Sequence, residues 1–253
     1  MLRVVVVGAS SGLGRCIGTG LARRGAKVAL LARRFDLLEA AAKEAGTGTI
    51  ALRCDATDPD SAKSAIQEAA MAFDGLDALV YAPAIGPLGA IEDTNAETWR
   101  RVLDTNVIGA SLVTAAALGY LAESHGTAAY LSSVSASITP PWPGLGSYAV
   151  SKAALDKLVE AWRAEHPAVN FTRLIVGDCI GGTGDSMTQF ANGWDPELAG
   201  RFHSVWTARN YLAGAFVDPE DLVSIVDSLL RSGSSISIPT VVVAPRPAHP
   251  RSA

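Results

Sequence analysis

The stretch SSVSASITPPWPGLGSYAVSK, residues 132 to 152, contains residue types that can move a proton. Tyr148 and Lys152 are four residues apart, so on a helix they point to the same face. A free tyrosine has a pKa of about 10, and a nearby ammonium group favours the phenolate and lowers this pKa. The phenol can then exchange a proton with a carbonyl or alcohol oxygen, while a serine hydroxyl holds the same oxygen. The alternative is an amphipathic surface pair.

A glycine-rich segment, GASSGLG at residues 8 to 14, directly follows a short apolar run at residues 4–7. Glycines at this place let the backbone turn tightly and let a pyrophosphate approach the start of the next helix. The position between a first strand and a first helix is the context that nucleotide binding requires. We therefore predict that this segment binds a nucleotide through Gly8, Ser10, Ser11, Gly12, Leu13 and Gly14.

The second apolar run ends in Ala32-Arg33-Arg34. A protein that binds the ribose 2′-hydroxyl of NAD has an acidic side chain at this place. Arginine instead suits a bidentate contact with a 2′-phosphate. The pair Arg33 and Arg34 therefore favours NADP(H) over NAD(H), the alternative being solvated charges at the end of a strand.

Short β-branched runs alternate with longer helical segments along the chain. This alternation predicts an α/β fold with a Rossmann-type, doubly wound parallel sheet in a single three-layer α/β/α domain, residues 1–243. Residues 244–253 are rich in proline and are expected to form a flexible tail. The predicted strands are residues 4–7, 27–31, 49–53, 76–81, 128–132, 169–176 and 236–243, and the predicted helices are 14–24, 35–45, 61–73, 96–124, 147–165 and 218–231.

Residues 181–215 interrupt this alternation with a segment rich in glycine and aromatic residues. In open α/β sheets, ligands bind beyond the carboxyl ends of the strands. An insertion after the sixth strand is well placed to cover a substrate there, and the alternative is an ordinary packed surface segment.

The composition limits the classes of molecule that the protein is expected to bind. A chain of 253 residues with 49% hydrophobic residues and a net charge of -4 can bury a large core, and this charge argues against nucleic acid as the main partner. Three separated cysteines and four scattered histidines predict neither a disulfide framework nor a metal site. The apolar run at residues 4–7 is too short for a signal peptide or a membrane span, so we expect a cytoplasmic protein without membrane contact.

Taken in order, these motifs resemble the classical short-chain dehydrogenases/reductases over nearly the whole chain. The matching segments are GASSGLG at 8–14, CDAT at 54–57, LDTNVIG at 103–109 and YAVSK at 148–152. The resemblance implies that Asp55 and Ala56 contact the adenine end of the cofactor and that Lys152 binds the nicotinamide ribose. It implies that Asn106 positions a water in a proton relay with Ser133, Tyr148 and Lys152. The activity it implies is NADP(H)-dependent hydride transfer on a small carbonyl or alcohol, by a homodimer or homotetramer built on helices 96–124 and 147–165.

The chain departs from the family pattern at three places. Val7 replaces a threonine, and Val176-Gly177 replaces Pro-Gly after the sixth strand. Tyr81-Ala82-Pro83-Ala84 replaces Asn-Asn-Ala-Gly after the fourth strand, and Ala82 is still expected beside the cofactor. These departures favour one alternative function, a nucleotide-binding sensor or scaffold without turnover.

Two ways of identifying the catalytic serine, the spacing from the tyrosine and the local motif, give different residues. The family's usual spacing, about 13 residues before the tyrosine, gives Ser135 (148 − 135 = 13). The local motif Ser132-Ser133-Val134 after the fifth strand gives Ser133, if the proline-rich segment 139–144 holds two extra residues. We favour Ser133 because the end of a strand is more rigid than a loop, with Ser137 as a lesser candidate.

Overall fold

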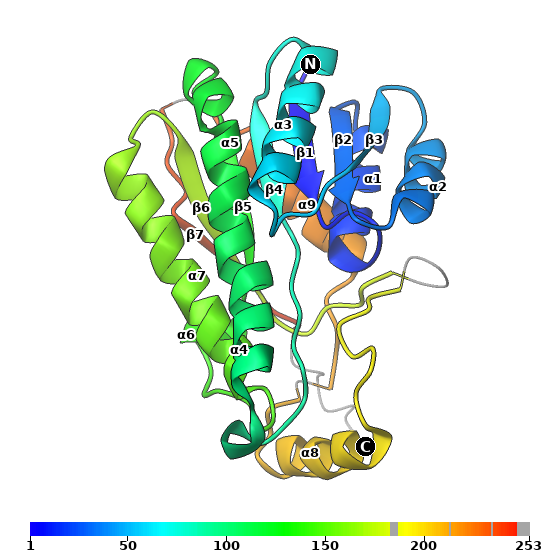
Figure 1. The fold of residues 1–253 in the computed structure, drawn as a ribbon, viewed down its shortest axis with the longest axis vertical. Helices are drawn as coiled ribbons and strands as arrows, with labels where there is room; N and C mark the ends of the chain where they lie inside the picture. Colours follow the sequence, from blue (N-terminus) through cyan, green and yellow to red (C-terminus); the bar gives the residue numbers. More distant parts are fainter. Residues whose placement is uncertain (183–186, 213, 234, 247–253) are drawn as a thin grey trace.

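The structure is a computed structural model that describes residues 1–182, 187–212, 214–233 and 235–246. Within these residues, seven parallel strands form one sheet in the order β3-β2-β1-β4-β5-β6-β7 (Figure 1). The predicted single α/β domain of Rossmann type is confirmed. The strands are β1 (Arg3–Val7), β2 (Lys27–Ala32), β3 (Thr49–Arg53), β4 (Ala78–Tyr81), β5 (Thr127–Ser133), β6 (Asn170–Val176) and β7 (Thr240–Val243).

The side chains of strand β1 show that the sheet is buried on both faces. Val5 and Val7 belong to one core cluster, and Val4 and Val6 belong to the other. A continuous run of β-branched residues is typical of such a doubly covered strand, because successive side chains point to opposite faces.

Helices cover the two faces of the sheet (Figure 1). The helices α3, α5 and α7 pack on one face, and α1, α2 and α9 pack on the other. The helices are α1 (Gly12–Arg23), α2 (Phe35–Ala45), α3 (Pro59–Phe73), α4 (Ala96–Leu103), α5 (Gly109–Glu123), α6 (Val134–Ser137), α7 (Gly146–Glu165), α8 (Pro196–Ala208) and α9 (Pro219–Leu230), with a short 3-10 turn, η1 (Ile91–Asp93).

The predicted long helix 96–124 is not uniform. A π-helical segment, η2 (Asp104–Ile108), lies between α4 and α5 and carries Asn106. Such segments inside α-helices are frequent at functional sites. The span Ala96–Glu123 is long and apolar enough to cross a membrane by length and composition, but this is weak evidence because core helices of soluble proteins pass the same test. In the structure it packs against α3 and α7.

Asp-Pro pairs begin three helices. Asp58 accepts a hydrogen bond from the Ser61 amide at 2.7 Å and begins α3, as the sequence predicts. Asp218 caps α9 in the same way. Asp195 caps α8, a helix inside the insertion that the sequence analysis did not predict although it has the same start signal.

Some predicted boundaries were wrong. The last strand begins at Thr240 rather than at residue 236, because Pro239 has no N–H to donate to a ladder. The first helix begins at Gly12 rather than at Gly14. Residues 247–253 of the predicted tail lie outside the described residues.

Candidate active site

The strand order reverses between β1 and β4, and the candidate site lies at the carboxyl ends of the strands around this point. A cleft of about 600 Å³ opens there. It brings together residues from both predicted ends of the site. Its lining includes Gly8, Ser10, Ser11, Gly12, Leu13, Gly14, Arg33, Arg34, Asp55, Ala56, Ala82, Ser133, Ser135, Tyr148 and Lys152.

The glycine-rich loop forms a tight turn between β1 and α1. Gly8 and Gly12 have φ angles of +78° and +60°, in the left-handed region that favours glycine. A Cβ on Gly14 would lie 2.4 Å from the Gly8 carbonyl oxygen. The loop is therefore a cradle that larger residues would fill, which fits a bound pyrophosphate.

The start of α1 is open to a ligand. Ser11 is the N-cap residue, but its side chain makes no capping hydrogen bond to the helix. The hydroxyls of Ser10 and Ser11 instead accept hydrogen bonds from Arg34, at 2.8 and 2.6 Å. A helix start whose amides are not capped by a side chain attracts an anionic group. The start of α1 therefore fits the phosphate of a dinucleotide.

Arg33 and Arg34 differ in what they contact. Arg34 is engaged with the loop serines. Arg33 is exposed, lines the cleft, and makes no hydrogen bond or ion pair with the rest of the described chain. Its charge acts on Asp55: burial raises the pKa of Asp55, but hydrogen bonds from Thr57 and the charge of Arg33 outweigh this and hold the pKa below its usual value.

The departure at residues 81–84 replaces one set of contacts with another. Tyr81 is fully buried, and its hydroxyl donates to the Thr105 carbonyl of η2 at 2.6 Å. Pro83 lies against Gly8, where a Cβ would approach the Pro83 nitrogen to 2.9 Å. A Cβ on Gly14 would lie 3.1 Å from the Ala82 Cβ. The segment therefore stays packed against the glycine-rich loop without the two asparagines.

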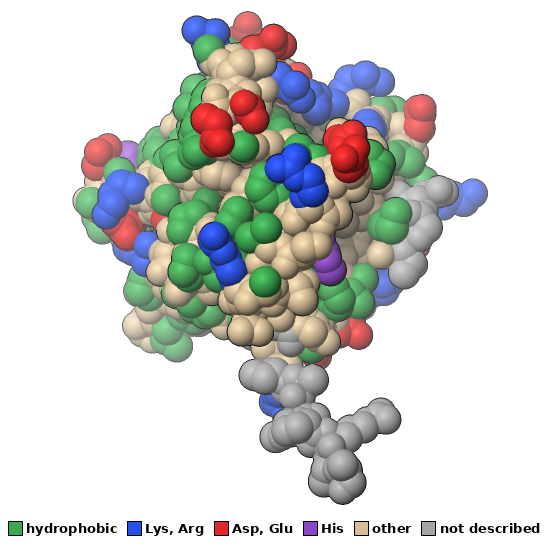
Figure 2. Space-filling view, turned by 90° about the horizontal axis from the view of Figure 1, so that it is seen from below, with side chains coloured by type: hydrophobic (Ala, Val, Ile, Leu, Met, Phe, Trp, Pro, Cys, Tyr) green, Lys and Arg blue, Asp and Glu red, His purple; other side chains and the backbone are tan. Residues whose placement is uncertain are grey.

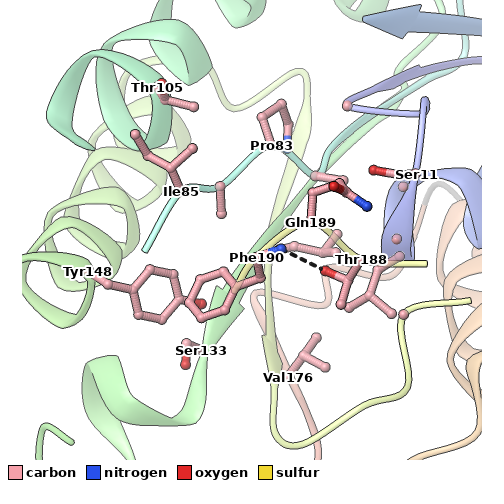
Figure 3. Close-up of a pocket in the computed structure, with 18 of the residues that line it drawn as sticks. Ser11, Pro83, Ile85, Thr105, Ser133, Tyr148, Val176, Thr188, Gln189 and Phe190 are labelled. Atoms are coloured by element: carbon pink, nitrogen blue, oxygen red, sulfur yellow. Dashed lines mark hydrogen bonds between the residues drawn. The ribbon is translucent and has the colours of Figure 1, made fainter. Parts of the chain in front are cut away.

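The structure brings two of the three candidate serines to the cleft. Ser133 is the last residue of β5, and its hydroxyl is close enough to Tyr148 to act on the pKa of the phenol. Ser135 follows in the first turn of α6, and its hydroxyl lies 2.9 Å from that of Ser133. Ser137 is exposed and points to Asp156 on α7. The strand-end hydroxyl of Ser133 is thus the one that acts on Tyr148, and both side chains line the cleft (Figure 3).

Burial controls the titration of the Tyr–Lys pair. Lys152 is 2% exposed, and its Nζ donates to the Leu131 carbonyl at 2.6 Å. Burial lowers the pKa of Lys152 to about 8, against the charge of Asp156. Burial also raises the pKa of Tyr148 to about 12, against the hydrogen bond with Ser133. The pKa of Tyr148 is thus raised rather than lowered as expected, because desolvation outweighs the effect of Ser133. The Lys152 ammonium lies 5.9 Å from the ring centroid.

Asn106 is completely buried and does not line the cleft. Its side chain accepts from the Ile85 amide and donates to the Ile85 carbonyl and the Ser151 hydroxyl, each at 2.9 Å. Ser151 in turn donates to the Tyr148 carbonyl at 2.7 Å. Asn106 therefore ties the loop after β4 to the first turns of α7, and its place in a proton relay stays a prediction.

The insertion reaches the cleft through aromatic residues. Phe190 contacts Tyr148 edge to face, with centroids 4.9 Å apart (Figure 3). A Cβ on Gly86 would lie 2.2 Å from the Phe190 ring, so the ring sits directly on this glycine. Trp194 donates to the Gly86 carbonyl at 2.8 Å. The sequence predicted that the aromatic segment 181–215 could cover a substrate. It did not identify Phe190 as the contact, because nothing in the sequence pairs this residue with Tyr148.

Curated relatives share much of the sequence. A family model described as short chain dehydrogenase matches residues 3–192. Glycine betaine reductase ATRR of Emericella nidulans is 28% identical over 246 residues, which cover 96% of this chain and 18% of the relative. The 11-beta-hydroxysteroid dehydrogenase-like 2 of Arabidopsis thaliana is 33% identical over 180 residues, which cover 69% of this chain and 58% of the relative. The chain thus spans less than two thirds of the length of these relatives.

Solved structures share the fold. A short-chain type dehydrogenase/reductase from Mycobacterium marinum has a TM-score of 0.81 at 26% identity, over 96% of this chain and 94% of that one. An alcohol dehydrogenase from Thermococcus sibiricus complexed with 5-hydroxy-NADP has a TM-score of 0.80 at 23% identity, over 100% of both chains. A 3-ketoacyl-(acyl-carrier-protein) reductase from Brucella melitensis complexed with NADH has a TM-score of 0.79 at 23% identity, over 95% of this chain and 96% of that one. Both kinds of nicotinamide cofactor thus occur among these neighbours.

Proposed function

The chain belongs to the short-chain dehydrogenase/reductase family, and from this premise we propose that it is an NADP(H)-dependent oxidoreductase that interconverts a small carbonyl compound and its alcohol. The observation that carries the proposal is the convergence of Ser133, Tyr148 and Lys152 on the cleft that also holds the glycine-rich loop. When bound, the nicotinamide would supply or accept the hydride.

Tyr148 is the proposed proton donor in carbonyl reduction. With a pKa of about 12, its phenol is protonated at neutral pH and has a proton to give. Ser133 lines the cleft beside the tyrosine and would donate to the substrate oxygen as negative charge develops on it. Lys152 carries the positive charge that stabilises the phenolate left after proton transfer.

Arg33 is the proposed ligand of the 2′-phosphate. Its guanidinium is exposed at the cleft and makes no hydrogen bond or salt bridge in the described chain, although its charge acts on Asp55. Arg34 would act indirectly, by holding the hydroxyls of Ser10 and Ser11. Asp55 and Ala56 line the cleft beyond Arg33 and would contact the adenine end.

The substrate side of the cleft favours a largely apolar molecule. On this side the lining includes hydrophobic and aromatic side chains, among them Ile85, Trp142, Leu145 and Phe190. On the face seen from below, hydrophobic side chains lie between scattered charges of both signs (Figure 2). A neutral ketone or secondary alcohol fits such a lining better than an anionic substrate.

The proposed assembly is a homodimer or homotetramer. The two long helices leave apolar side chains at the surface, such as Ile108 at 47% and Val150 at 48% exposure. Burial of these side chains against a second copy would remove apolar surface from water. Light scattering on the purified chain tests this proposal, and a monomer at micromolar concentration would contradict it.

The test of the proposed function is NADPH oxidation against a panel of neutral ketones. Tyr148→Phe removes the proposed proton donor, so we expect kcat to fall by about 10²- to 10⁴-fold. The matched control is Tyr130→Phe, which removes another buried phenol, one bonded to Thr114 away from the cleft. Equal turnover by wild type and Tyr148→Phe would exclude the proposed role.

The second candidate is a nucleotide-binding sensor without turnover. The observation that favours it is Phe190, whose ring packs against Tyr148 where a substrate would approach. Calorimetry separates the two functions: NADPH binding with no turnover on a broad carbonyl and alcohol panel would favour the sensor.

A further inference from the structure

Helix α7 carries a row of polar residues at intervals of four: Tyr148, Lys152, Asp156 and Glu160. Residues at this spacing lie on one face of a helix. Tyr148 and Lys152 have proposed roles, and Glu160 lies nearer the surface. Asp156 has no role in the proposed function, yet it is 5% exposed. A buried carboxylate with no partner is costly, so its position needs an explanation.

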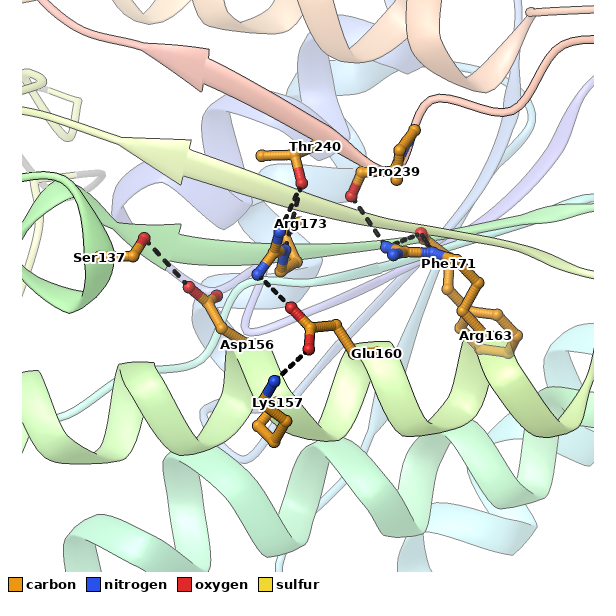
Figure 4. A network of polar contacts seen from close by, with 9 residues as sticks. All are labelled: Ser137, Asp156, Lys157, Glu160, Arg163, Phe171, Arg173, Pro239 and Thr240. Atoms are coloured by element: carbon orange, nitrogen blue, oxygen red, sulfur yellow. Dashed lines mark hydrogen bonds and ion pairs between the residues drawn. The ribbon is translucent and has the colours of Figure 1, made fainter.

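The local hydrogen bonds do not supply this explanation. One carboxylate oxygen of Asp156 accepts a long hydrogen bond from Ser137, at 3.4 Å (Figure 4). The other oxygen, Oδ1, is buried without a hydrogen bond of normal geometry in the described chain, and so is the hydroxyl of Ser132 on β5. Ser132 is still close enough to act against the burial that raises the pKa of Asp156.

Two cations act on the Asp156 carboxylate, Arg173 and Lys152, and they differ in what they already contact. Arg173 on β6 binds Glu160 at 2.7 Å and Thr240 at 2.8 Å (Figure 4). Arg173 is thus bonded directly to Glu160, which also pairs with Lys157. The charge of Arg173 nevertheless also lowers the pKa of Asp156, ahead of the charge of Lys152. The Lys152 ammonium donates to the Leu131 carbonyl, a neutral acceptor.

The other elements packed against this part of α7 contribute neutral groups. The strand β5 contributes Ser132, α6 contributes Ser137, and η2 contributes Asn106, which contacts Ser151. Among the described groups, Asp156 is thus the carboxylate that is available to balance Lys152.

We propose that Asp156 is a positioning residue that keeps the buried Lys152 ammonium charged beneath Tyr148. Burial lowers the pKa of Lys152 to about 8, and Asp156 is the group that acts against this lowering. Without the carboxylate, Lys152 would lose its proton within the neutral range, and the phenolate of Tyr148 would lose its stabilising charge. This inference rests on the proposed function for its consequence, but not for its physical test.

The physical test is a titration of the lysines by NMR. The chain has five lysines, Lys27, Lys43, Lys63, Lys152 and Lys157, so ¹³C-labelled lysine gives a simple spectrum, and loss of one signal in Lys152→Met assigns it. We expect wild-type Lys152 to titrate near 8, and in Asp156→Asn the midpoint should fall by about one unit. The matched control Glu160→Gln, which removes the next carboxylate along the helix, should leave it in place. An unchanged midpoint in Asp156→Asn overturns the inference, with or without turnover.

The interaction between Asp156 and Lys152 can also be measured by titrating Asp156. In Lys152→Met the carboxyl carbon of Asp156 should titrate at a higher pH than in wild type, because coupling between two groups is reciprocal. This measurement decides the question even if Asp156→Asn fails to fold. An Asp156 midpoint that does not respond to Lys152→Met contradicts the inference.

Turnover supplies the functional readout. In ketone reduction, the alkaline limb of kcat should move to lower pH by about one unit in Asp156→Asn, a loss of about tenfold above the limb, and Asp156→Glu should restore most of it. A purely structural role would instead lower activity equally at all pH values. Absence of turnover in wild type would count against the proposed function. The lysine titration would then decide by itself whether Asp156 keeps Lys152 charged.

Discussion

The nucleotide end and the chemical end of the cleft are built in different ways. The nucleotide end is built mainly on the continuous β1–α1–β2 unit, in which backbone turns at glycines and an exposed arginine face the cleft, with Asp55 and Ala82 added from the loops after β3 and β4. The chemical end combines β5, α7, η2 and the insertion, and its ionisable side chains are buried, as for Lys152, or half-buried, as for Tyr148. Exposed arginines keep their charge at all ordinary pH values. Protonation at the buried end is set by desolvation instead, so the two ends should respond differently to mutation and pH.

The largest expected effect separates the two serines of the chemical end. Ser133→Ala removes the strand-end hydroxyl that acts on Tyr148 and should lower kcat by about 10²-fold or more. Ser135→Ala removes a group that touches Ser133 and should cost about tenfold or less. Steady-state kinetics with NADPH and a ketone measures both. The reverse order would move the catalytic role to Ser135.

Two arginine variants sharpen the account of the nucleotide end. Arg33→Ala should weaken NADPH binding by about 10- to 100-fold, because it removes a charge-assisted contact, and leave NADH nearly unchanged. Arg34→Ala should weaken both cofactors by a similar, smaller factor, because Arg34 holds the shared loop. Calorimetry with the two cofactors checks this. A matching loss of NADPH and NADH in Arg33→Ala would remove Arg33 from the 2′-phosphate site.

The pH dependence compares the two ends within one protein. The pKa of Lys152 is lowered to about 8, so its charge is present below this pH and is lost as the pH rises through it. We expect kcat for ketone reduction to fall about tenfold per unit above this limb. NADPH affinity should change much less over the same range, since Arg33 stays charged. A kcat that stays flat from pH 7 to about 9.5 would contradict the proposed role of the Lys152 charge.

The smallest expected effect concerns the insertion. Phe190→Ala removes the edge-to-face contact with Tyr148 and should change KM for bulky ketones by about two- to tenfold. Gly86→Ala should act in the same direction, because its Cβ would displace the Phe190 ring. The control is Phe202→Ala, whose ring stacks on Trp206. Equal KM changes in all three variants would mean that the segment acts through general packing.

The sequence predicted the sheet because the fold follows from local patterns. Residues 4–7 read as a doubly buried strand, and GASSGLG needs glycine at turns that larger residues cannot adopt. The YxxxK spacing places Tyr148 and Lys152 on one helix face wherever that helix lies. It also extends to Asp156, a signal present in the sequence but not used, because a third residue at the same interval is common on any helix.

Contacts between distant segments could not be predicted in this way. No local pattern indicates that Tyr81 bonds η2, that Arg34 holds the loop serines, or that Phe190 lies on Gly86. The π-helical turn at Asn106 was also missed, because its sequence is compatible with an ordinary helix.

The sequence by itself thus determined the family, the alternation of strands and helices along the chain and which residue types face the cleft. Only the tertiary structure decided which serine acts on Tyr148, which of Arg33 and Arg34 makes no hydrogen bond within the described residues, and how far Lys152 and Tyr148 are removed from water. The physical reason is that spacing along a helix or strand is fixed by local backbone geometry. Desolvation and partner choice depend instead on atoms brought from elsewhere in the chain, and these set the charge of the groups proposed to transfer the proton.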